Sequence, residues 1–98
     1  MSSKFYSNNN KGFQMTFGNG WSISVQFGYG NYCQNNHHPM GFYFSKNQDV
    51  TTSEDAEIAI WDKDGNWYNF GNDTVKGYCS ADDVAGWINK VSNFTPVI

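Results

Sequence analysis

The sequence predicts an α+β domain in which two β-hairpins form an antiparallel sheet of about four to six strands and one C-terminal helix packs on that sheet. Three observations indicate this fold. The chain contains four Trp, six Tyr and eight Phe but neither Leu nor Arg, and aromatic and β-branched side chains suit the pleated surface of a strand. Apolar and polar residues alternate on both sides of an Asn-Gly step. Near the C-terminus the apolar spacing changes to that of a helix.

The first hairpin is predicted around Gly18-Asn19-Gly20, because an Asn-Gly step between two alternating segments is a strong turn signal. The strands are expected in residues 13–17 and 21–27. Their apolar residues should share one buried face, and these are Phe13, Met15, Phe17, Trp21, Ile23, Val25 and Phe27. The polar residues between them should face solvent or a second surface, and these are Ser22, Ser24 and Gln26.

The second hairpin is predicted to consist of a strand at 56–61, a turn at 62–65 and a return strand at 66–70. A short strand is expected at 42–44, followed by a polar loop over 45–55, and a short extended segment at 75–79. We expect one domain over residues 1–98, because its length is that of a single domain. Residues 1–11 are polar and rich in Asn, so we expect them to be flexible.

The C-terminal helix is predicted to start at Ser80, a favourable N-cap residue, with Asp82 in its first turn. Ser80 and Asp83 have the spacing of a capping box, and Lys90 lies where the helix dipole favours a cation. One apolar stripe should face the sheet, and its residues are Val84, Trp87, Ile88 and Val91.

Composition excludes several classes of function. The net charge is −3 and the pI is near 5.0, which disfavours nucleic-acid binding because phosphates require a basic patch. No apolar run is long enough to span a membrane, and the first residues do not resemble a signal peptide. The sequence therefore predicts a soluble, cytoplasmic protein. In that compartment, Cys33 and Cys79 are expected to be reduced thiols.

The segment 28–41 holds the candidate binding site. It combines aromatic faces for stacking, amides that can form hydrogen bonds and two imidazoles, a set suited to a purine or another planar polar ligand. Gly28 and Gly30 allow close approach to the backbone. The candidate ligand-binding residues are Tyr29, Asn31, Tyr32, Asn35, Asn36, His37 and His38. The alternative is an irregular loop whose Asn and Gly residues serve turn geometry.

Other chemistry in this segment stays open. Cys33, His37 and His38, with Cys79, have the ligand types of a zinc site, although no C-x2-C or H-x3-H pair supports one. A Cys33–Cys79 disulfide and a Cys33–His nucleophile–base pair are further alternatives. We expect no metal, no cofactor and no catalysis.

Two acidic segments have simpler interpretations. The sequence Asp62-Lys-Asp64-Gly65-Asn66 resembles the start of a calcium loop but lacks the closing Glu, so a β-turn is predicted. Glu54, Asp55 and Glu57 form a cluster that is expected to be the solvated start of a strand, with a basic partner as the alternative.

The second hairpin carries aromatic residues on both faces. Ile58 and Ile60 alternate with Ala59 and Trp61, and the segment 66–70 also has aromatic residues at odd and even positions. One short helix covers only one face, so the other face should bind a partner. Self-association is the preferred explanation, and we expect a homo-oligomer.

Three segments resemble small uncharacterised proteins of tailed bacteriophages. They are FGNGWSISVQFGYGNYC (17–33), AEIAIWDKDGNWYNF (56–70) and VKGYCSADDVAGWI (75–88). The resemblance covers about half of the chain. It implies residence in the cytoplasm of an infected bacterium and an accessory role, and it transfers no catalytic residue.

These observations lead to a functional hypothesis with two alternatives. The hypothesis is a small non-enzymatic binding protein that counters bacterial immunity by sequestering a nucleotide-derived signal. Without Arg, phosphates would depend on Lys, backbone N–H groups and the helix N-terminus. The alternatives are a protein–protein inhibitor of a host defence enzyme and a minor virion component.

Overall fold

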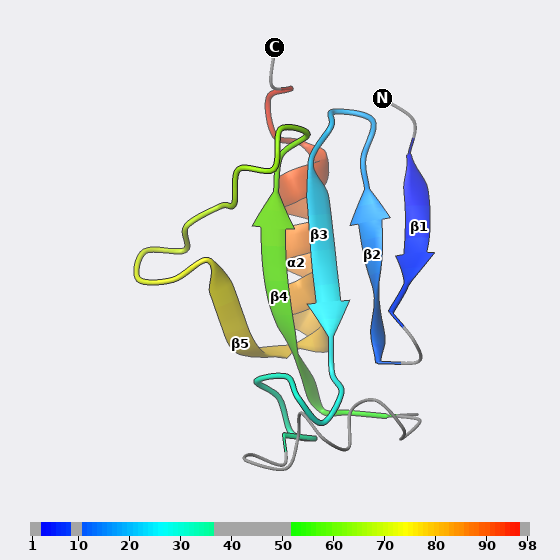
Figure 1. The fold of residues 1–98 in the computed structure, drawn as a ribbon, viewed down its shortest axis with the longest axis vertical. Coiled ribbons are helices and arrows are strands. Elements are labelled where there is room, and N and C mark those ends of the chain that lie inside the picture. Colours follow the sequence, from blue (N-terminus) through cyan, green and yellow to red (C-terminus); the bar gives the residue numbers. More distant parts are fainter. Residues whose placement is uncertain (1–2, 9–10, 37–51, 97–98) are drawn as a thin grey trace.

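The computed structural model describes residues 3–8, 11–36 and 52–96. In this part of the chain, five strands form an antiparallel sheet in which every strand pairs with the next one along the chain, and helix α2 packs on one face (Figure 1). The elements are β1 (Lys4–Ser7), β2 (Gly12–Thr16), β3 (Ser22–Gln26), β4 (Asp55–Trp61), β5 (Val75–Ser80) and α2 (Ala81–Ser92). The predicted α+β fold is confirmed. None of the described helices is long and apolar enough to cross a membrane.

The first hairpin is confirmed as β2 and β3, which pair from Gly12 opposite Gln26 to Thr16 opposite Ser22. All seven apolar residues predicted to share a face are buried or packed against the core. The turn also has a function beyond reversing the chain. The Asn19 side chain accepts a hydrogen bond from the Trp21 N–H at 3.0 Å and donates to the carbonyls of Val91 and Phe94 at 2.9 and 3.0 Å. The hairpin turn is therefore tied to the end of α2.

Helix α2 begins as the sequence predicts. The Ser80 hydroxyl accepts from the Asp83 N–H at 3.1 Å, and the Asp83 carboxylate accepts from the Ser80 N–H at 3.2 Å, which completes the capping box. The stripe faces the sheet: Val84 and Val91 are buried, and Trp87 and Ile88 are half-buried against the core.

The core lies between α2 and the last three strands. Its buried residues are Ile23, Val25, Ala56, Ile58, Ile60, Cys79, Val84 and Val91. The helix contacts β3, β4 and β5, and in Figure 1 it lies behind the middle of the sheet, leaving β1 and β2 beyond its cover. We call the face that α2 covers the helix side and the opposite face the open face.

The predicted return strand at 66–70 is wrong. The segment forms only an isolated bridge, Trp61 opposite Trp67, and β4 pairs with β3 on one side and with β5 on the other. After the Tyr68 N–H donates to the Ile60 carbonyl, the chain leaves the sheet, so that the rings of Tyr68 and Phe70 pack against Trp87. Residues 66–70 thus distribute their aromatic side chains between the two faces without forming a second strand.

The N-terminal segment also differs from expectation, because residues 4–7 form the edge strand β1. All four are exposed, so no pattern of burial marks them in the sequence. The strand predicted at 42–44 and most of the polar loop predicted at 45–55 lie outside the described residues.

Candidate functional site

The open face of the sheet carries a groove of about 320 Å3. It is formed by β2, β3, β4, the start of β5 and Trp67. Its main lining side chains are Gln14, Ser24, Gln26, Glu57, Trp61 and Trp67. Hydroxyl, carboxamide, carboxylate and indole groups therefore meet in one depression, which we call the open-face groove.

Two indole rings form one wall of this groove. The ring centroids of Trp61 and Trp67 are 5.5 Å apart with an interplanar angle of 32°. Trp67 is 53% exposed, so much of its surface is available. An indole supported by a second ring presents a flat surface on which a planar ligand can stack. The alternation along β4 predicts that Trp61 lies on the face of the sheet away from Ile58 and Ile60. Trp67 is not among the predicted site residues.

A hydrogen-bonded network lies at the other end of the groove. The Asn31 amide donates to Glu57 Oε1 at 3.1 Å and to Gln26 Oε1 at 3.3 Å. Gln26 in turn donates to the Ser24 hydroxyl at 2.9 Å. The predicted loop residue Asn31 therefore supports the groove, because it orients two of the polar groups that line it.

The other predicted amides are engaged in holding the loop. The Asn35 amide donates to the carbonyls of Phe27 and Thr52 at 2.8 and 2.9 Å. The Asn36 amide donates to the Asn31 carbonyl at 2.8 Å. Both donor positions of Asn31 and of Asn35 are thus used within the protein, and these side chains shape the site by fixing the loop.

The acidic cluster has a role that neither of its two sequence interpretations included. Glu57 Oε2 accepts from the Tyr32 N–H at 3.0 Å, and Asp55 Oδ1 accepts from the Gln34 N–H at 2.6 Å. In the other direction, the Glu54 N–H donates to the Gln34 side-chain oxygen at 2.8 Å. The start of β4 therefore supplies acceptors for loop N–H groups that have no strand partner.

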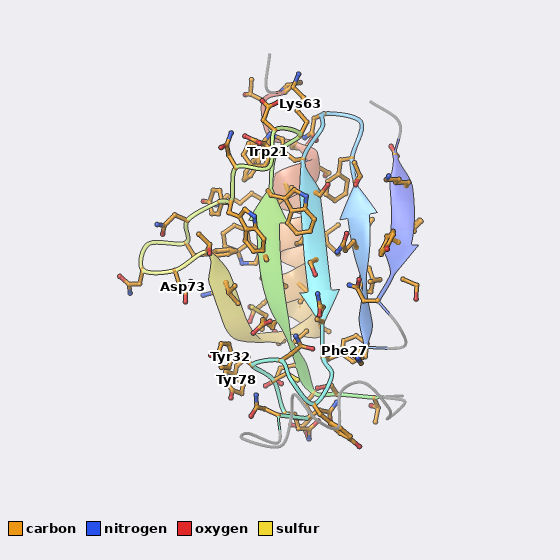
Figure 2. All side chains as sticks on the ribbon, viewed as in Figure 1. Trp21, Phe27, Tyr32, Lys63, Asp73 and Tyr78 are labelled. Carbon is orange, nitrogen blue, oxygen red and sulfur yellow. The ribbon has the colours of Figure 1, made fainter. Side chains whose placement is uncertain are left out.

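Two exposed tyrosines lie beside each other at the same end of the molecule (Figure 2). Tyr32 is 57% and Tyr78 is 61% exposed, and the Tyr78 N–H donates to the Tyr32 carbonyl at 2.9 Å. Tyr78 has a φ of 56°, which is unfavourable for a bulky residue. At the neighbouring Gly77, a Cβ atom would lie 2.7 Å from the Cβ of Tyr32, so glycine permits this close approach. Tyr29, also predicted, is half-buried.

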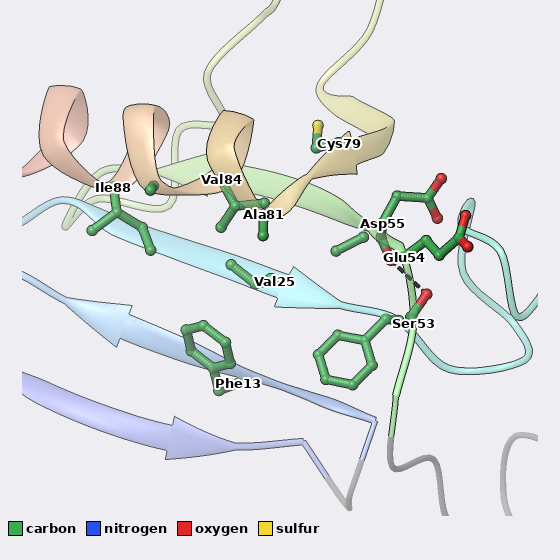
Figure 3. Close-up of a pocket in the computed structure, with 12 residues that line it drawn as sticks. Phe13, Val25, Ser53, Glu54, Asp55, Cys79, Ala81, Val84 and Ile88 are labelled. Carbon is green, nitrogen blue, oxygen red and sulfur yellow. Dashed lines mark hydrogen bonds between the residues drawn. The ribbon is translucent and has the colours of Figure 1, made fainter.

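A second cavity, of about 280 Å3, lies between the N-terminal half of α2 and the sheet (Figure 3). Phe13, Val25 and Ile88 give it apolar walls, and Glu54 and Asp55 also line it. It is the more apolar of the two cavities, and it has fewer groups that would orient a polar ligand.

Electrostatics restrict what the two cavities can bind. Each is lined by carboxylate side chains, Glu57 in one and Glu54 with Asp55 in the other, and none of the described residues that line them is a Lys. A phosphate group placed in either cavity would face a carboxylate with no compensating cation. The groove is therefore suited to the uncharged part of a ligand.

The two cysteines are free thiols, and both are buried. Burial raises the pKa of the Cys33 thiol and of the Cys79 thiol, and Cys33 Sγ donates to the Gly28 carbonyl at 3.5 Å. A nucleophilic cysteine needs a lowered pKa and access, so these surroundings do not favour the nucleophile alternative. His37 and His38 lie outside the described residues, and in the described part of the chain no three His, Cys, Asp or Glu side chains are placed so that they could hold a metal ion.

The Asp62 segment forms the predicted turn. Asp62 Oδ1 accepts from the N–H groups of Asp64 and Asn66 at 2.9 and 3.0 Å, and Gly65 has a φ of 82°. The hydrogen bond from the Asn66 backbone is the main cause that lowers the pKa of Asp62, against the opposing effect of burial. The carboxylate is thus used inside the turn.

Comparison with known proteins adds no family to these observations. No protein-family model matches the chain, and neither a curated protein nor a solved structure does. The resemblance to bacteriophage proteins stays a prediction from the three sequence segments.

Proposed function

We propose that this chain is a small non-enzymatic binding protein that sequesters a nucleotide-like molecule by stacking its base in the open-face groove. The observation that carries the proposal is the exposed, ring-supported indole of Trp67 beside the polar lining of the groove. A nucleobase offers a flat π surface for the indole, and its edge offers donors and acceptors for Gln14, Gln26 and Ser24.

The ordered surroundings of the groove support binding of a ligand. Asn31, Glu57 and Gln26 hold one another in place. Their side chains therefore lose little conformational entropy when the groove binds a ligand. The carboxylate of Glu57 disfavours phosphate inside the groove, and the phosphates of a nucleotide would extend outward to solvent. In the bacteriophage setting that the sequence implies, such a protein would remove a nucleotide-derived signal of bacterial immunity from the host cytoplasm.

The first experiment is native mass spectrometry of protein purified gently from a bacterial lysate, followed by calorimetric titration with nucleosides, nucleotides and cyclic oligonucleotides. An added mass of a few hundred daltons on the purified chain, or heat of binding in the titrations, is the expected result. If no compound binds at concentrations on the order of tens of micromolar, the nucleotide proposal is wrong.

Substitution of Trp67 locates the binding surface. Because base–aromatic stacking contributes about 1–3 kcal/mol, Trp67→Ala should weaken binding by roughly 5- to 150-fold. Phe5→Ala is the matched control, since Phe5 is an exposed aromatic residue whose strand position places it on the helix side, with Met15. Thermal unfolding of both variants verifies that they are folded. Equal binding by both variants would exclude the groove as the site.

A protein–protein inhibitor is the second candidate. It is favoured by apolar side chains on the helix side of β1 and β2: Phe5 is 77% exposed, and its cross-strand neighbour Met15 is half-buried on a strand that α2 does not contact. Large exposed aromatic residues are characteristic of protein interfaces. A stoichiometric host protein captured from lysate, together with absence of any small-molecule adduct, would favour this candidate over the first.

A further inference from the structure

Among the described strands, β1 pairs with β2 alone, and its outer edge is a regular strand edge. The Asn8 N–H donates to the Gly12 carbonyl at 3.1 Å, and the register places Tyr6 opposite Gln14 and Lys4 opposite Thr16. Because the backbone groups of an antiparallel strand alternate in direction, Lys4, Tyr6 and Asn8 turn their N–H and C=O groups toward β2. Phe5 and Ser7 therefore turn theirs outward, away from the sheet.

The opposite edge of the sheet is less suited to pairing. In β5 the register with β4 shifts between Ala56 and Ile58. Tyr78 has a left-handed backbone, and its N–H donates to the Tyr32 carbonyl. Bulges and covered backbone groups are the means by which proteins protect sheet edges. Of the two edges of the described sheet, β1 is the one that presents regular donors and acceptors.

An apolar surface continues inward from this open edge. Phe5 is 77% exposed, and its neighbour across the strand pair is Met15. Both lie on the helix side, but α2 contacts only β3, β4 and β5. A partner that pairs with β1 would therefore also cover Phe5, which is a large apolar group left in water by the single chain.

We propose that a second copy of this chain pairs with β1 in antiparallel orientation, about a two-fold axis at Phe5. In this register, Phe5 lies opposite Phe5 of the second copy and the two residues exchange both of their backbone hydrogen bonds. The outward N–H of Ser7 donates to the Ser3 carbonyl of the second copy. By symmetry, the Ser7 N–H of the second copy donates to the Ser3 carbonyl of the first. The two sheets become continuous, and the two Phe5 rings lie together on the helix side.

The chemistry of β1 favours a second copy as the occupant. Under the two-fold axis Lys4 lies opposite Tyr6 of the second copy and not opposite Lys4, so no like charges meet, and the tyrosine ring is available to the cation. Small serines meet serines beside the Phe5 pair, and outward donors face outward acceptors. A four-residue edge buries less surface than a standard stable interface, so we expect a reversible dimer with an affinity on the order of micromolar or weaker.

Cysteine cross-linking tests the register. Lys4 and Tyr6 of the second copy would form a non-hydrogen-bonded pair with Cα atoms roughly 4.5 Å apart, which is within disulfide reach. Chains carrying Lys4→Cys are mixed with chains carrying Tyr6→Cys under mild oxidation, and the products are identified by intact mass. Enrichment of the mixed dimer over both homodimers supports the proposal. Predominance of the Tyr6→Cys homodimer, or a statistical mixture of the three dimers, would overturn the proposed register.

Sedimentation across a concentration series that reaches the millimolar range tests the edge itself. Ser7→Pro removes an outward N–H without removing a bond to β2, and proline is tolerated at such edge positions. Because two bonds per dimer are lost, the dissociation constant should rise roughly 30-fold. Ser7→Ala, the matched control, keeps the N–H and should dimerise like the unmodified chain. A chain that stays monomeric throughout, or a dimer unaffected by Ser7→Pro, would overturn the proposal and leave this edge to a segment of another protein.

Discussion

Asn31 is the residue that links the loop after β3 to the open face of the sheet. Its Oδ1 accepts from the Gly28 N–H at 2.9 Å, which closes the first turn of the loop. Its Nδ2 donates to Glu57 and Gln26, two residues that line the groove. One amide therefore satisfies a backbone donor and orients a carboxylate and a carboxamide, and this requires an acceptor and a donor on the same side chain.

Replacement of Asn31 by aspartate should expose this double requirement. Asn31→Asp keeps the acceptor for Gly28 but loses the donor and places a second carboxylate beside Glu57. We expect the free energy of unfolding to fall by about 2 kcal/mol, measured by urea denaturation at neutral pH. Asn72→Asp is the control, because it makes the same chemical change at an exposed position in a loop. Equal stability of the two variants would contradict the role assigned to Asn31.

Asp62 provides a pH-dependent contribution to stability. Its folded-state pKa lies below the ordinary value of 3.8, chiefly because the Asn66 backbone N–H donates to the carboxylate. The unfolded chain therefore takes up the proton first as the pH falls. The stabilisation is fully present above the unfolded pKa and is lost as the pH falls through the folded pKa.

An Asp62→Asn variant should test this sign. Its stability should decline less on acidification from neutral pH than that of the unmodified chain, and the two should converge in strong acid. Urea midpoints measured along a pH series provide the comparison. A variant that loses stability in parallel with the unmodified chain would show that Asp62 does not contribute to the acid response.

Helix α2 combines strong end signals with a weak interior. Ser80 and Asp83 form its capping box, and Lys90 lies in its last turn with its Nζ 4.7 Å from the centroid of the Trp87 ring. Gly86, in the middle, is exposed, and a Cβ atom built there would have no neighbour within 4 Å. Glycine has no packing role at this position, and it lowers the intrinsic preference for the helix.

Gly86→Ala should therefore stabilise the protein by about 1 kcal/mol, because alanine loses less backbone entropy in a helix. The free energy of unfolding from urea denaturation is the measurement. The contrasting variant is Gly77→Ala, whose Cβ would meet the Tyr32 side chain at 2.7 Å, and it should destabilise the protein. An unchanged or lowered stability of Gly86→Ala would show that the helix interior is constrained in a way its open surroundings do not indicate.

The elements show how far alternation and spacing predict this fold. The hairpin of β2 and β3 and the capped helix followed from the sequence, because side-chain periodicity and short-range capping are local. Residues 66–70 are also rich in aromatic residues, yet they form no strand. Residue types that suit a strand do not determine which backbone groups the N–H groups of that segment bind. The edge strand β1 buries no residue, so periodicity could not mark it.

The candidate site was less predictable than the fold. Composition directed attention to the loop after β3, and the structure connects Asn31 of that loop to the groove. Composition could not indicate that the Asn35 amide donates to the Phe27 and Thr52 carbonyls, or that Glu57 is the acceptor for the Tyr32 N–H. Asn35 and Thr52 lie 17 residues apart and Tyr32 and Glu57 lie 25 residues apart, and their pairing depends on the register of β3 and β4. The exposed face of Trp67 likewise depends on where the chain leaves the sheet.

The whole molecule is organised asymmetrically about its sheet. Strands β3 and β4 are paired on both sides and covered by α2, and they hold the fully buried residues Ile23, Ile58 and Ile60. Strand β1 is paired on one side, has no helix over it and is exposed along its length. Local stability should therefore fall from the centre of the sheet toward β1, since amides are protected by pairing and burial together.

Amide hydrogen exchange followed residue by residue should reveal this gradient. In dilute protein, the slowest amides should be those of Ile23, Val25, Ile58 and Ile60, and β1 should exchange faster by orders of magnitude. Raising the protein concentration should slow the outward amides of Phe5 and Ser7 if β1 pairs between copies, and change the inward amide of Tyr6 much less. Exchange from β1 as slow as from β3 in dilute protein would contradict the gradient, because it would require the edge strand to open only when the whole sheet unfolds.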